Sequence, residues 1–491
     1  MIVQFVGCIS TQSTVADVAI VDKVASSGLR EQVIYAAPLM RANLSPVRWE
    51  AIWDNEYARV PTPTETTLHN GGWTSSYTHG PMPLDELSEW VDEAAARVSQ
   101  LYPRRVLEVG CGAGMLVARV APRCERYVGI DISDYAVNYV KQNVAQKLKS
   151  SCGLEIIRLD ARELSHLAPR RFDTVVINSV VQYLSSAAEL VEILDAALAM
   201  LEPQGAIYVG DVLDLRLRRS AYLLAELARA EDEFPLDRVR ELLDFRLATD
   251  IELALHPEFF IGYASDRNLH TCLLLKHTQR VTEFTRFRYD AVISRRPLYG
   301  PDRVLSARLA QSSNELRALI ESTQSCTITD VPNRKTRDPV AAEHHLARLR
   351  ATTGELINAV RFRDRGQLDW VEELLLGSGR DFEPLVSLAG ADVQDLACRP
   401  INGVGEAIGE QYPCSNRYSH DDCASVANSP DRATNVFNLI PHLRGALPPE
   451  VREAVFGMRW VLVDRIPRNI AGEPIAGELP RPHQDGMSTP F

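Results

Sequence analysis

The stretch Arg105-Val-Leu-Glu-Val-Gly-Cys-Gly-Ala-Gly114 decides the fold of this chain. Its first five residues are mostly apolar and predict a short strand. The glycines at 110, 112 and 114 end that strand, and residues 115–120 have the character of a helix start. Because glycine has no Cβ, the backbone N–H groups of this turn can approach a ligand closely. The stretch therefore predicts a strand, a ligand-binding turn and a helix.

Strands and helices alternate after this turn. The next apolar stretch, residues 127–131, predicts a second strand, and residues 135–148 have helical spacing. This order predicts βαβ units and a mostly parallel, doubly wound sheet. Further segments are predicted as strands at 154–159, 172–178, 206–211, 273–276 and 284–292, and as helices at 187–201, 215–255, 339–362 and 368–376. We expect the last two of these strands to close the domain near residue 293.

Two acids follow strands at positions that suit a nucleoside ligand. Asp131 ends the second strand about 20 residues after the turn, where a carboxylate can bind two ribose hydroxyls. The alternative for Asp131 is a helix N-cap, because Ser133 and Asp134 follow it. Asp160 ends the third strand, where a carboxylate can accept a hydrogen bond from an adenine amino group. The alternative for Asp160 is a solvated loop acid.

A polar loop at residues 178–183 follows the fourth strand and carries Asn178, Ser179, Gln182 and Tyr183. Open α/β sheets bind their ligands at the carboxyl ends of the strands. We therefore expect this loop to face a pocket. Helix capping by Asn178 or Ser179 is the alternative for one of the two.

The composition limits the partners of the chain. Its 491 residues include 53 basic and 65 acidic ones, a formal charge of −12. This charge opposes the phosphate attraction that supplies most nonspecific nucleic-acid affinity, so we expect neither nucleic acid nor an anionic membrane as a partner. No apolar run approaches the roughly 18 residues of a membrane span. Nine scattered cysteines without a CxxC pair favour reduced thiols in a cytoplasm over a disulfide framework or a metal site.

A series of motifs runs in order along the chain: Glu108 to Gly114, Asp131, Asp160, residues 172–178 and residues 201–205. Together they resemble the motifs of class I S-adenosylmethionine-dependent methyltransferases. More narrowly, residues from about 46 to 293 resemble the methyltransferase domains embedded in nonribosomal peptide synthetases. The segments that carry this narrower resemblance are 72–78, 81–83, 89–91, 178–183, 210–212, 256–260 and 283–290.

The resemblance implies a Rossmann-like fold and S-adenosylmethionine as the cofactor. Trp73 and Tyr77 would belong to an N-terminal lid, where aromatic faces attract a sulfonium and exclude water. Plain packing of Trp73 against the sheet is the alternative. The implied cofactor-binding residues are Trp73, Tyr77, Glu108, Gly110, Gly112, Gly114, Asp131, Ile132, Asp160, Ala161 and Asn178.

The acceptor side of the expected site has its own candidate residues. Asp211 ends the fifth strand and is the first candidate to orient an acceptor amine, with Asn178, Gln182 and Tyr183 as further catalytic candidates. The alternative for Asp211 is capping of the next helix or pairing with nearby arginines.

The flanks resemble the small C-terminal subdomain of an adenylation domain, which methyltransferase domains of this family interrupt. Residues 14–38 are similar to its first strands, and segments between 427 and 482 are similar to its end. The resemblance implies that residues 1–45 form the first part of this α+β subdomain, that 46–293 form the methyltransferase domain with its lid, and that 294–491 form the remainder with a helical linker. Glu473 stands where the family has a lysine that touches the adenylate, and its negative charge would repel that group. We therefore expect no adenylation activity.

The leading function is transfer of a methyl group from S-adenosylmethionine to an aminoacyl or peptidyl group on a carrier protein of a nonribosomal peptide synthetase module. The amine nitrogen is the expected acceptor. Methylation of oxygen, sulfur or carbon, of an amino acid or a free small molecule, is one alternative. Intramolecular alkylation of the cofactor and a non-catalytic synthetase scaffold are the others.

Overall fold

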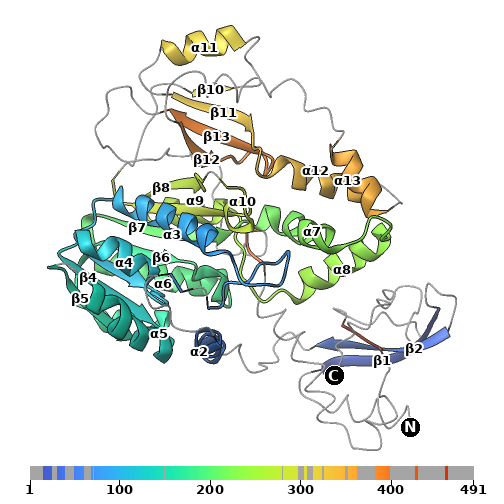
Figure 1. Ribbon diagram of the computed structural model, residues 1–491, viewed down its shortest axis with the longest axis horizontal. Coiled ribbons are helices and arrows are strands. Elements are labelled where there is room, and N and C mark those ends of the chain that lie inside the picture. Colours follow the sequence, from blue (N-terminus) through green and yellow to red (C-terminus); the bar gives the residue numbers. More distant parts are fainter. Residues whose placement is uncertain are drawn as a thin grey trace, which may run out of the picture. The chain divides into compact units, whose positions relative to one another are not determined.

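The computed structural model describes fourteen stretches of the chain, drawn in colour in Figure 1. They are residues 15–24, 30–38, 49–59, 68–69, 71–148, 151–278, 280–296, 304–306, 313–322, 326–348, 352–361, 382–398, 426–428 and 459–462. The chain divides into two compact units. One comprises Met1–Val47, Arg240–Ile251 and Ser429–Phe491, and the other comprises Arg48–Val239 and Glu252–Asn428.

The first unit contains a small sheet built from both ends of the sequence. Strands β1 (Val15–Val24) and β2 (Arg30–Pro38) pair antiparallel, and β14 (Arg459–Leu462) pairs parallel to β2. Trp460 lies opposite Ile34, whose side chain is fully buried. The two flanks of the chain therefore fold together. Their assignment to an adenylation subdomain stays a prediction.

The second unit is built on a sheet of eleven described strands, in the order β10-β11-β13-β12-β8-β9-β7-β6-β3-β4-β5. Strands β3 to β7 run parallel to one another. Strand β9 pairs antiparallel to β7, and β8 pairs antiparallel to β9. The predicted parallel, doubly wound α/β sheet is confirmed. The strand bounds are β3 Arg105–Val109, β4 Arg126–Asp131, β5 Gly153–Arg158, β6 Phe172–Asn178, β7 Leu201–Leu213, β8 His270–Leu275, β9 Arg288–Ser294, β10 Val304–Ser306, β11 Cys326–Pro332, β12 Phe382–Val386 and β13 Val393–Cys398.

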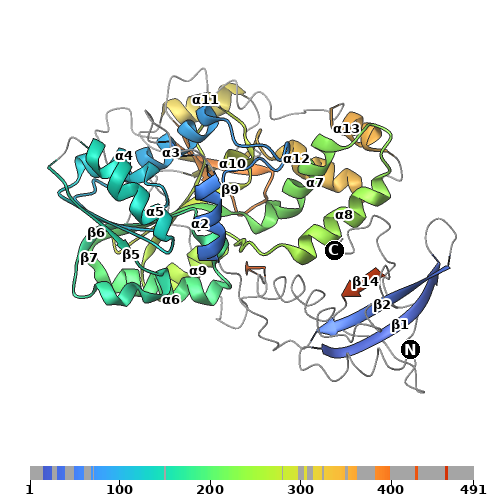
Figure 2. The ribbon, with the colours of Figure 1, turned by 60° about the horizontal axis from the view of Figure 1, so that its bottom comes forward.

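Helices cover both faces of this sheet (Figure 2). Side chains alternate between the faces along a strand, so Val106 and Leu107 of β3 point into two separate hydrophobic clusters. The cluster with Leu107 includes α6 and α9, and the cluster with Val106 includes α3, α4 and α5. The helix bounds are α2 Trp49–Arg59, α3 Leu84–Ser99, α4 Met115–Val120, α5 Asp134–Tyr139, α6 Ala187–Met200, α7 Arg218–Arg229, α8 Leu236–Thr249, α9 Glu258–Asp266, α10 Glu283–Arg286, α11 Ser313–Glu321, α12 Arg337–Leu346 and α13 Thr353–Arg361.

The second unit continues beyond the boundary predicted at residue 293. Strand β12 meets β8 at Leu385 and Leu274, and β13, β11 and β10 extend the sheet from there. A buried ion pair between Arg97 of α3 and Glu383 of β12 links this extension to the helical layer. The described residues between 294 and 428 therefore belong to the unit of the parallel sheet and not to the flanking unit.

Two further predictions differ from the structure in detail. The strand expected at 284–292 begins only at Arg288, because Thr282 caps a short helix, α10, before it. The helix expected at 339–362 is two helices, α12 and α13. The helix predicted at 368–376 and the position of Glu473 lie outside the described residues. None of the helices among the described residues combines the length and the apolar character that crossing a bilayer requires.

Candidate cofactor and acceptor site

The glycine turn lies at the carboxyl end of β3 and needs glycine at each of its three glycine positions. Gly110, Gly112 and Gly114 have φ values of 74°, 50° and 78°, in the left-handed region that other residues rarely adopt. A Cβ at Gly110 would lie 2.3 Å from Val180 Cγ2, so this glycine also makes room for the neighbouring loop. Gly110 N and Cys111 N donate to Ile130 O, and Gly114 N donates to Cys111 O, so the turn is hydrogen-bonded within the protein, and its contact with a ligand stays a prediction.

Asp131 is tied to the turn by hydrogen bonds from the backbone. Its Oδ2 accepts from Gly112 N at 2.7 Å, and its Oδ1 accepts from Ser133 N at 2.9 Å. Burial raises the pKa of Asp131, and the backbone N–H donors oppose that shift. The helix cap that was the alternative for Asp131 is supplied by Ser133, whose Oγ accepts from Ala136 N at 3.0 Å. Ile132 lies between the two.

Asp160 follows β5 and is engaged by its own neighbour. Its Oδ1 accepts from the backbone N of Arg162 at 2.9 Å, and both carboxylate oxygens accept from the Arg162 guanidinium. Burial would raise the pKa of Asp160, but the hydrogen bonds from Arg162 outweigh it and the pKa is lowered. Asp160 thus caps the short turn that begins at Ala161. Contact of Asp160 and Ala161 with adenine stays a prediction.

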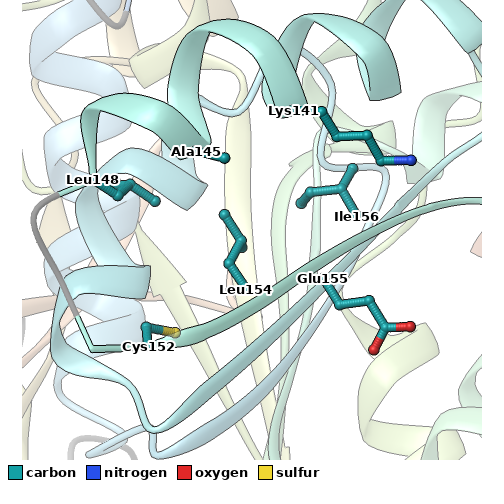
Figure 3. A pocket seen from close by; sticks show the side chains of 7 residues that line it. All are labelled: Lys141, Ala145, Leu148, Cys152, Leu154, Glu155 and Ile156. Atoms are coloured by element: carbon teal, nitrogen blue, oxygen red, sulfur yellow. The ribbon is translucent and has the colours of Figure 1, made fainter.

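A cavity of about 440 Å³ lies elsewhere, beside the edge strand β5 (Figure 3). None of the predicted cofactor or catalytic residues lines it. The sticks in Figure 3 show mostly apolar side chains there, with Lys141 and Glu155 as the charged ones. Its lining residues are Lys141, Ala145, Leu148, Cys152, Leu154, Glu155 and Ile156. This cavity is therefore separate from the predicted site.

Glu108 lies beneath the turn and is almost completely buried. Its Oε2 accepts a hydrogen bond from the Tyr127 hydroxyl at 2.7 Å. Burial is the main cause that raises the pKa of Glu108 to about 8. Glu108 is therefore largely a neutral carboxyl at pH 7 and supports the turn from below.

The raised pKa of Glu108 makes stability depend on pH. The folded chain keeps this proton up to about pH 8, whereas an unfolded glutamate loses it near 4.5. Stability is therefore fully present below pH 4.5 and falls as pH rises toward 8. Glu108→Gln keeps an acceptor for Tyr127 but cannot titrate. The wild-type free energy of unfolding falls as pH rises, whereas that of the variant does not. We therefore expect the stability difference between Glu108→Gln and wild type to grow by a few kcal/mol, in favour of the variant, from about pH 5 to about pH 9.

Denaturant unfolding at both pH values measures this difference. Glu163→Gln, an exposed change, is the control and is expected to keep the wild-type pH slope. An unchanged slope in Glu108→Gln would contradict a buried neutral carboxyl at this position.

Helix α2 packs over the glycine turn, and the sequence analysis missed it. A Cβ at Gly112 would lie 2.9 Å from the Tyr57 hydroxyl oxygen, and that oxygen accepts a hydrogen bond from the backbone N–H of Ala113. Asp54 accepts from Ser133 Oγ at 2.5 Å. Trp49, Trp53 and Tyr57 recur every fourth residue, an aromatic stripe that indicates a helix face packed on the site.

The polar loop after β6 places two amide oxygens without partners. Asn178 Oδ1 and Gln182 Oε1 are buried and accept no hydrogen bond within the part of the chain that the structure describes. The Tyr183 ring packs between Trp49, at 4.7 Å, and Trp53, at 5.3 Å. Burial raises the pKa of Tyr183, so its hydroxyl stays protonated. The loop therefore places acceptor oxygens after the carboxyl end of β6, and open α/β sheets bind their ligands at the carboxyl ends of their strands.

Asp211 is fully buried and is surrounded by donors. It accepts from Trp90 Nε1 at 2.9 Å, from Ser179 Oγ at 2.5 Å and from the Arg288 guanidinium at 2.5 Å. Burial would raise the pKa of Asp211, but Arg288 and then Lys276 outweigh it and lower the pKa. Pairing with an arginine, the alternative reading, is thus present in the structure. A direct role of Asp211 toward the amine stays a prediction.

The predicted lid residues Trp73 and Tyr77 lie beside helix α10. Trp73 packs against Trp90 at 4.7 Å and Phe284 at 5.4 Å, which is the packing alternative. The backbone N of Ser76 donates to Glu283 at 3.1 Å and ties this segment to α10. Burial raises the pKa of Tyr77 to about 12. Whether Trp73 and Tyr77 contact the cofactor stays a prediction.

Comparison with known proteins identifies one domain of the chain. Residues 107–207 match the family described as a methyltransferase domain. A probable non-canonical nonribosomal peptide synthetase, CymA of Salinispora arenicola, is 31% identical over 298 residues, which are 60% of this chain and 4% of that protein. PF 1022-synthetase of Rosellinia sp. is 24% identical over 474 residues, 88% of this chain and 15% of that protein. This chain thus spans a small part of the length of these relatives.

The comparison with solved structures includes an N-methyltransferase. The N-methyltransferase NodS from Bradyrhizobium japonicum, in complex with S-adenosyl-l-homocysteine, is 16% identical, with a TM-score of 0.31, over 50% of this chain and 95% of that one. The family match covers the glycine turn, Asp131 and the strands β3 to β6 that carry them. The chain therefore contains an S-adenosylmethionine-dependent methyltransferase domain of the kind found in nonribosomal peptide synthetases.

Proposed function

We propose that this domain methylates the amine nitrogen of an aminoacyl or peptidyl group tethered to a carrier protein in nonribosomal peptide biosynthesis. The observation that carries the proposal is that Asn178 Oδ1 and Gln182 Oε1 are buried and accept no hydrogen bond from the residues that the structure describes. A buried acceptor without a donor is costly, and a neutral amine brings N–H groups that satisfy it. The similarity to nonribosomal peptide synthetases supports the carrier-bound form of the substrate.

The residues around the glycine turn fit the cofactor. Gly110, Gly112 and Gly114 carry no Cβ of their own and so allow the left-handed backbone of this turn. Asp131, anchored by Gly112 N, would accept the ribose hydroxyls, and Ile132 would lie along the adenine. Asp160 and Ala161 would border the adenine edge, and Trp73 and Tyr77 would cover the site. Glu108 would support the turn from below.

The chain's own residues then position the amine. Asn178 and Gln182 would accept its N–H groups and direct its lone pair, because Asn178 ends β6 and Gln182 lies in the short helix that follows it. When bound, S-adenosylmethionine supplies a methyl group on a positive sulfur, which keeps the electron pair of the broken S–CH₃ bond as the N–CH₃ bond forms. Tyr183 keeps its own proton, and Asp211 is occupied by donors. The proton left on nitrogen therefore passes to water. Positioning supplies most of the acceleration.

We also propose that the chain does not adenylate amino acids. The reason is Glu473, a negative charge where the related subdomains have a lysine. This residue lies outside the described part of the structure. Exchange of labelled pyrophosphate into ATP in the presence of amino acids tests this point, and no exchange is expected.

The methyl acceptor is tested with the full chain, S-adenosylmethionine and a panel of aminoacyl carrier proteins. Intact-mass analysis of the carrier is expected to show a gain of one CH₂ for each methyl group. A hydroxyacyl carrier with the same side chain is the matched control, since it offers O–H in place of N–H. Methylation of the hydroxyacyl carrier alone would refute nitrogen as the acceptor. Methylation of a free amino acid with an unchanged carrier would refute the tethered substrate.

A further inference from the structure

The polar loop at residues 178–183 is called the acceptor loop below. One residue in this loop and one on the neighbouring strand have a backbone conformation that favours glycine. Ser179 has a φ of 56° and Asp211 a φ of 64°, and they follow the neighbouring strands' residues Asn178 and Gly210. Side-chain-bearing residues persist in the left-handed region only when their surroundings hold them there. Such strain clusters at functional sites, so what holds Ser179 and Asp211 is informative.

Hydrogen bonds link the two strained residues to each other. Ser179 N donates to Gly210 O at 3.1 Å, and Ser179 Oγ donates to Asp211 Oδ2 at 2.5 Å. Asp211 N in turn donates to Asp290 Oδ1 at 2.8 Å. The start of the acceptor loop is therefore fastened through one side chain, that of Asp211.

Buried cations hold Asp211 from behind. Arg288 donates to its Oδ2 at 2.5 Å, and the Arg288 guanidinium lies 4.6 Å from the centre of the Phe284 ring. Lys276, itself almost completely buried, donates to Asp290 at 2.6 Å and lies 3.8 Å from Asp211. Two carboxylates are thus matched by two cations. Pairing of this kind is what allows charged groups to remain buried.

We infer that Asp211, held by Arg288 and Asp290, is a positioning residue that fixes Ser179 and so aims the oxygens of Asn178 and Gln182 at the acceptor amine. This role rests on the proposed function. It differs from a direct action of Asp211 on the amine, because three donors already occupy its carboxylate. Trp90, one of these donors, also packs against Trp73, so the network reaches the predicted lid.

The role of Ser179 separates positioning from chemistry. Ser179→Ala removes the bond to Asp211 but leaves the pair of Asp211 and Arg288 intact. We expect kcat for the aminoacyl carrier to fall about 10- to 100-fold, because a displacement of about 1 Å has an effect of that size. The Kd of S-adenosylmethionine should stay within about twofold, since the cofactor residues are untouched.

Ser179→Gly is the conservative variant that discriminates. Glycine adopts a φ near 56° without strain, so the loop can keep its course without the hydroxyl. We expect Ser179→Gly to recover much of the activity that Ser179→Ala loses. Equal losses in the two variants would refute positioning through the backbone, as would full activity in Ser179→Ala. Asp211→Asn leaves a buried arginine unpaired, so Trp90→Phe serves as the milder second variant, with a smaller loss in kcat expected.

The matched control is Arg267→Met. Arg267 also pairs with an aspartate, Asp195, at 2.6 Å and lies 4.0 Å from an aromatic ring, that of Tyr263, but it belongs to the far helical layer. We expect its kcat to equal that of wild type. A loss as large as that in Ser179→Ala would assign both effects to general stability and overturn the inference.

A readout without any acceptor substrate separates this inference from the proposed function. Sinefungin carries an amine where S-adenosylmethionine carries the methylated sulfur, so its N–H groups probe Asn178 and Gln182 directly. We expect wild type to prefer sinefungin to S-adenosylhomocysteine, and Ser179→Ala to lose that preference about tenfold. If no carrier is methylated but this preference changes, the proposed function fails and the positioning role stands. If the preference is equal in both proteins, the positioning role fails.

Discussion

Replacing Asp131 with alanine is expected to weaken the binding of S-adenosylmethionine about 100-fold. The proposed ribose hydrogen bonds to this carboxylate are charge-assisted and contribute about 2–3 kcal/mol, which is about 1.5–2 powers of ten in Kd. The change also removes the acceptor of Gly112 N and Ser133 N, whereas the backbone bonds of Gly110 N and Cys111 N to Ile130 O remain. Calorimetric titration of the full chain with the cofactor measures the effect.

Asp134→Ala is the control for this experiment. Asp134 lies three residues further on and is mostly exposed, where it pairs with Arg158 at 3.1 Å. Surface pairs of this kind contribute little, so we expect binding within about twofold of wild type. A folded Asp131→Ala protein with wild-type affinity would show that the ribose is not bound at this carboxylate.

The parts of the site that local sequence encodes are the parts that the sequence predicts well. The strand, the three glycines and the helix start lie within residues 105–120, and backbone sterics alone fix the turn. Asp131 ends the neighbouring parallel strand, so βαβ geometry places it beside the turn. The confirmed α/β fold rests on these local rules.

The contacts that give Asp211 its environment are long-range, and sequence order does not contain them. Trp90 lies 121 residues before Asp211, and Arg288 lies 77 residues after it. Asp211 lies on β7 and Arg288 on β9, and these two strands pair in the sheet. The ion pair, and with it the charged state of Asp211, therefore depends on this strand pairing. The sequence therefore offers an arginine partner as an alternative without identifying Arg288.

The extension of the sheet and the aromatic helix were missed for different reasons. Strands β10 to β13 are short and pair beyond the antiparallel β8, so no βαβ pattern in the sequence predicts them. Helix α2 has a visible aromatic stripe, but such stripes usually mark packing against a core. The contacts of Tyr57 with the glycine turn and of Trp49 and Trp53 with Tyr183 are what link that stripe to the predicted site.

Replacing Asn178 with alanine is expected to lower kcat for the aminoacyl carrier about 100-fold. The side-chain oxygen is buried and has no partner among the described residues, so its proposed task is to accept from the amine. Losing a well-placed donor or acceptor at the reacting group typically has an effect of 10²- to 10³-fold. Stopped-flow or quenched single-turnover assays separate this step from cofactor binding.

Gly210→Ala tests the same oxygen from the opposite side. A Cβ there would lie 2.2 Å from Asn178 Oδ1 and 2.5 Å from Tyr208 Cε1, so the amide must turn away, although it is chemically unchanged, and the Tyr208 ring must shift as well. We expect a loss of activity similar to that in Asn178→Ala. Gly153→Ala is the matched control, because its Cβ meets nothing closer than 3.6 Å and the glycine begins the edge strand β5. If Gly210→Ala and Asn178→Ala fold and methylate at the wild-type rate, the acceptor amine is oriented by other groups, and the oxygens of this loop have no part in the transfer.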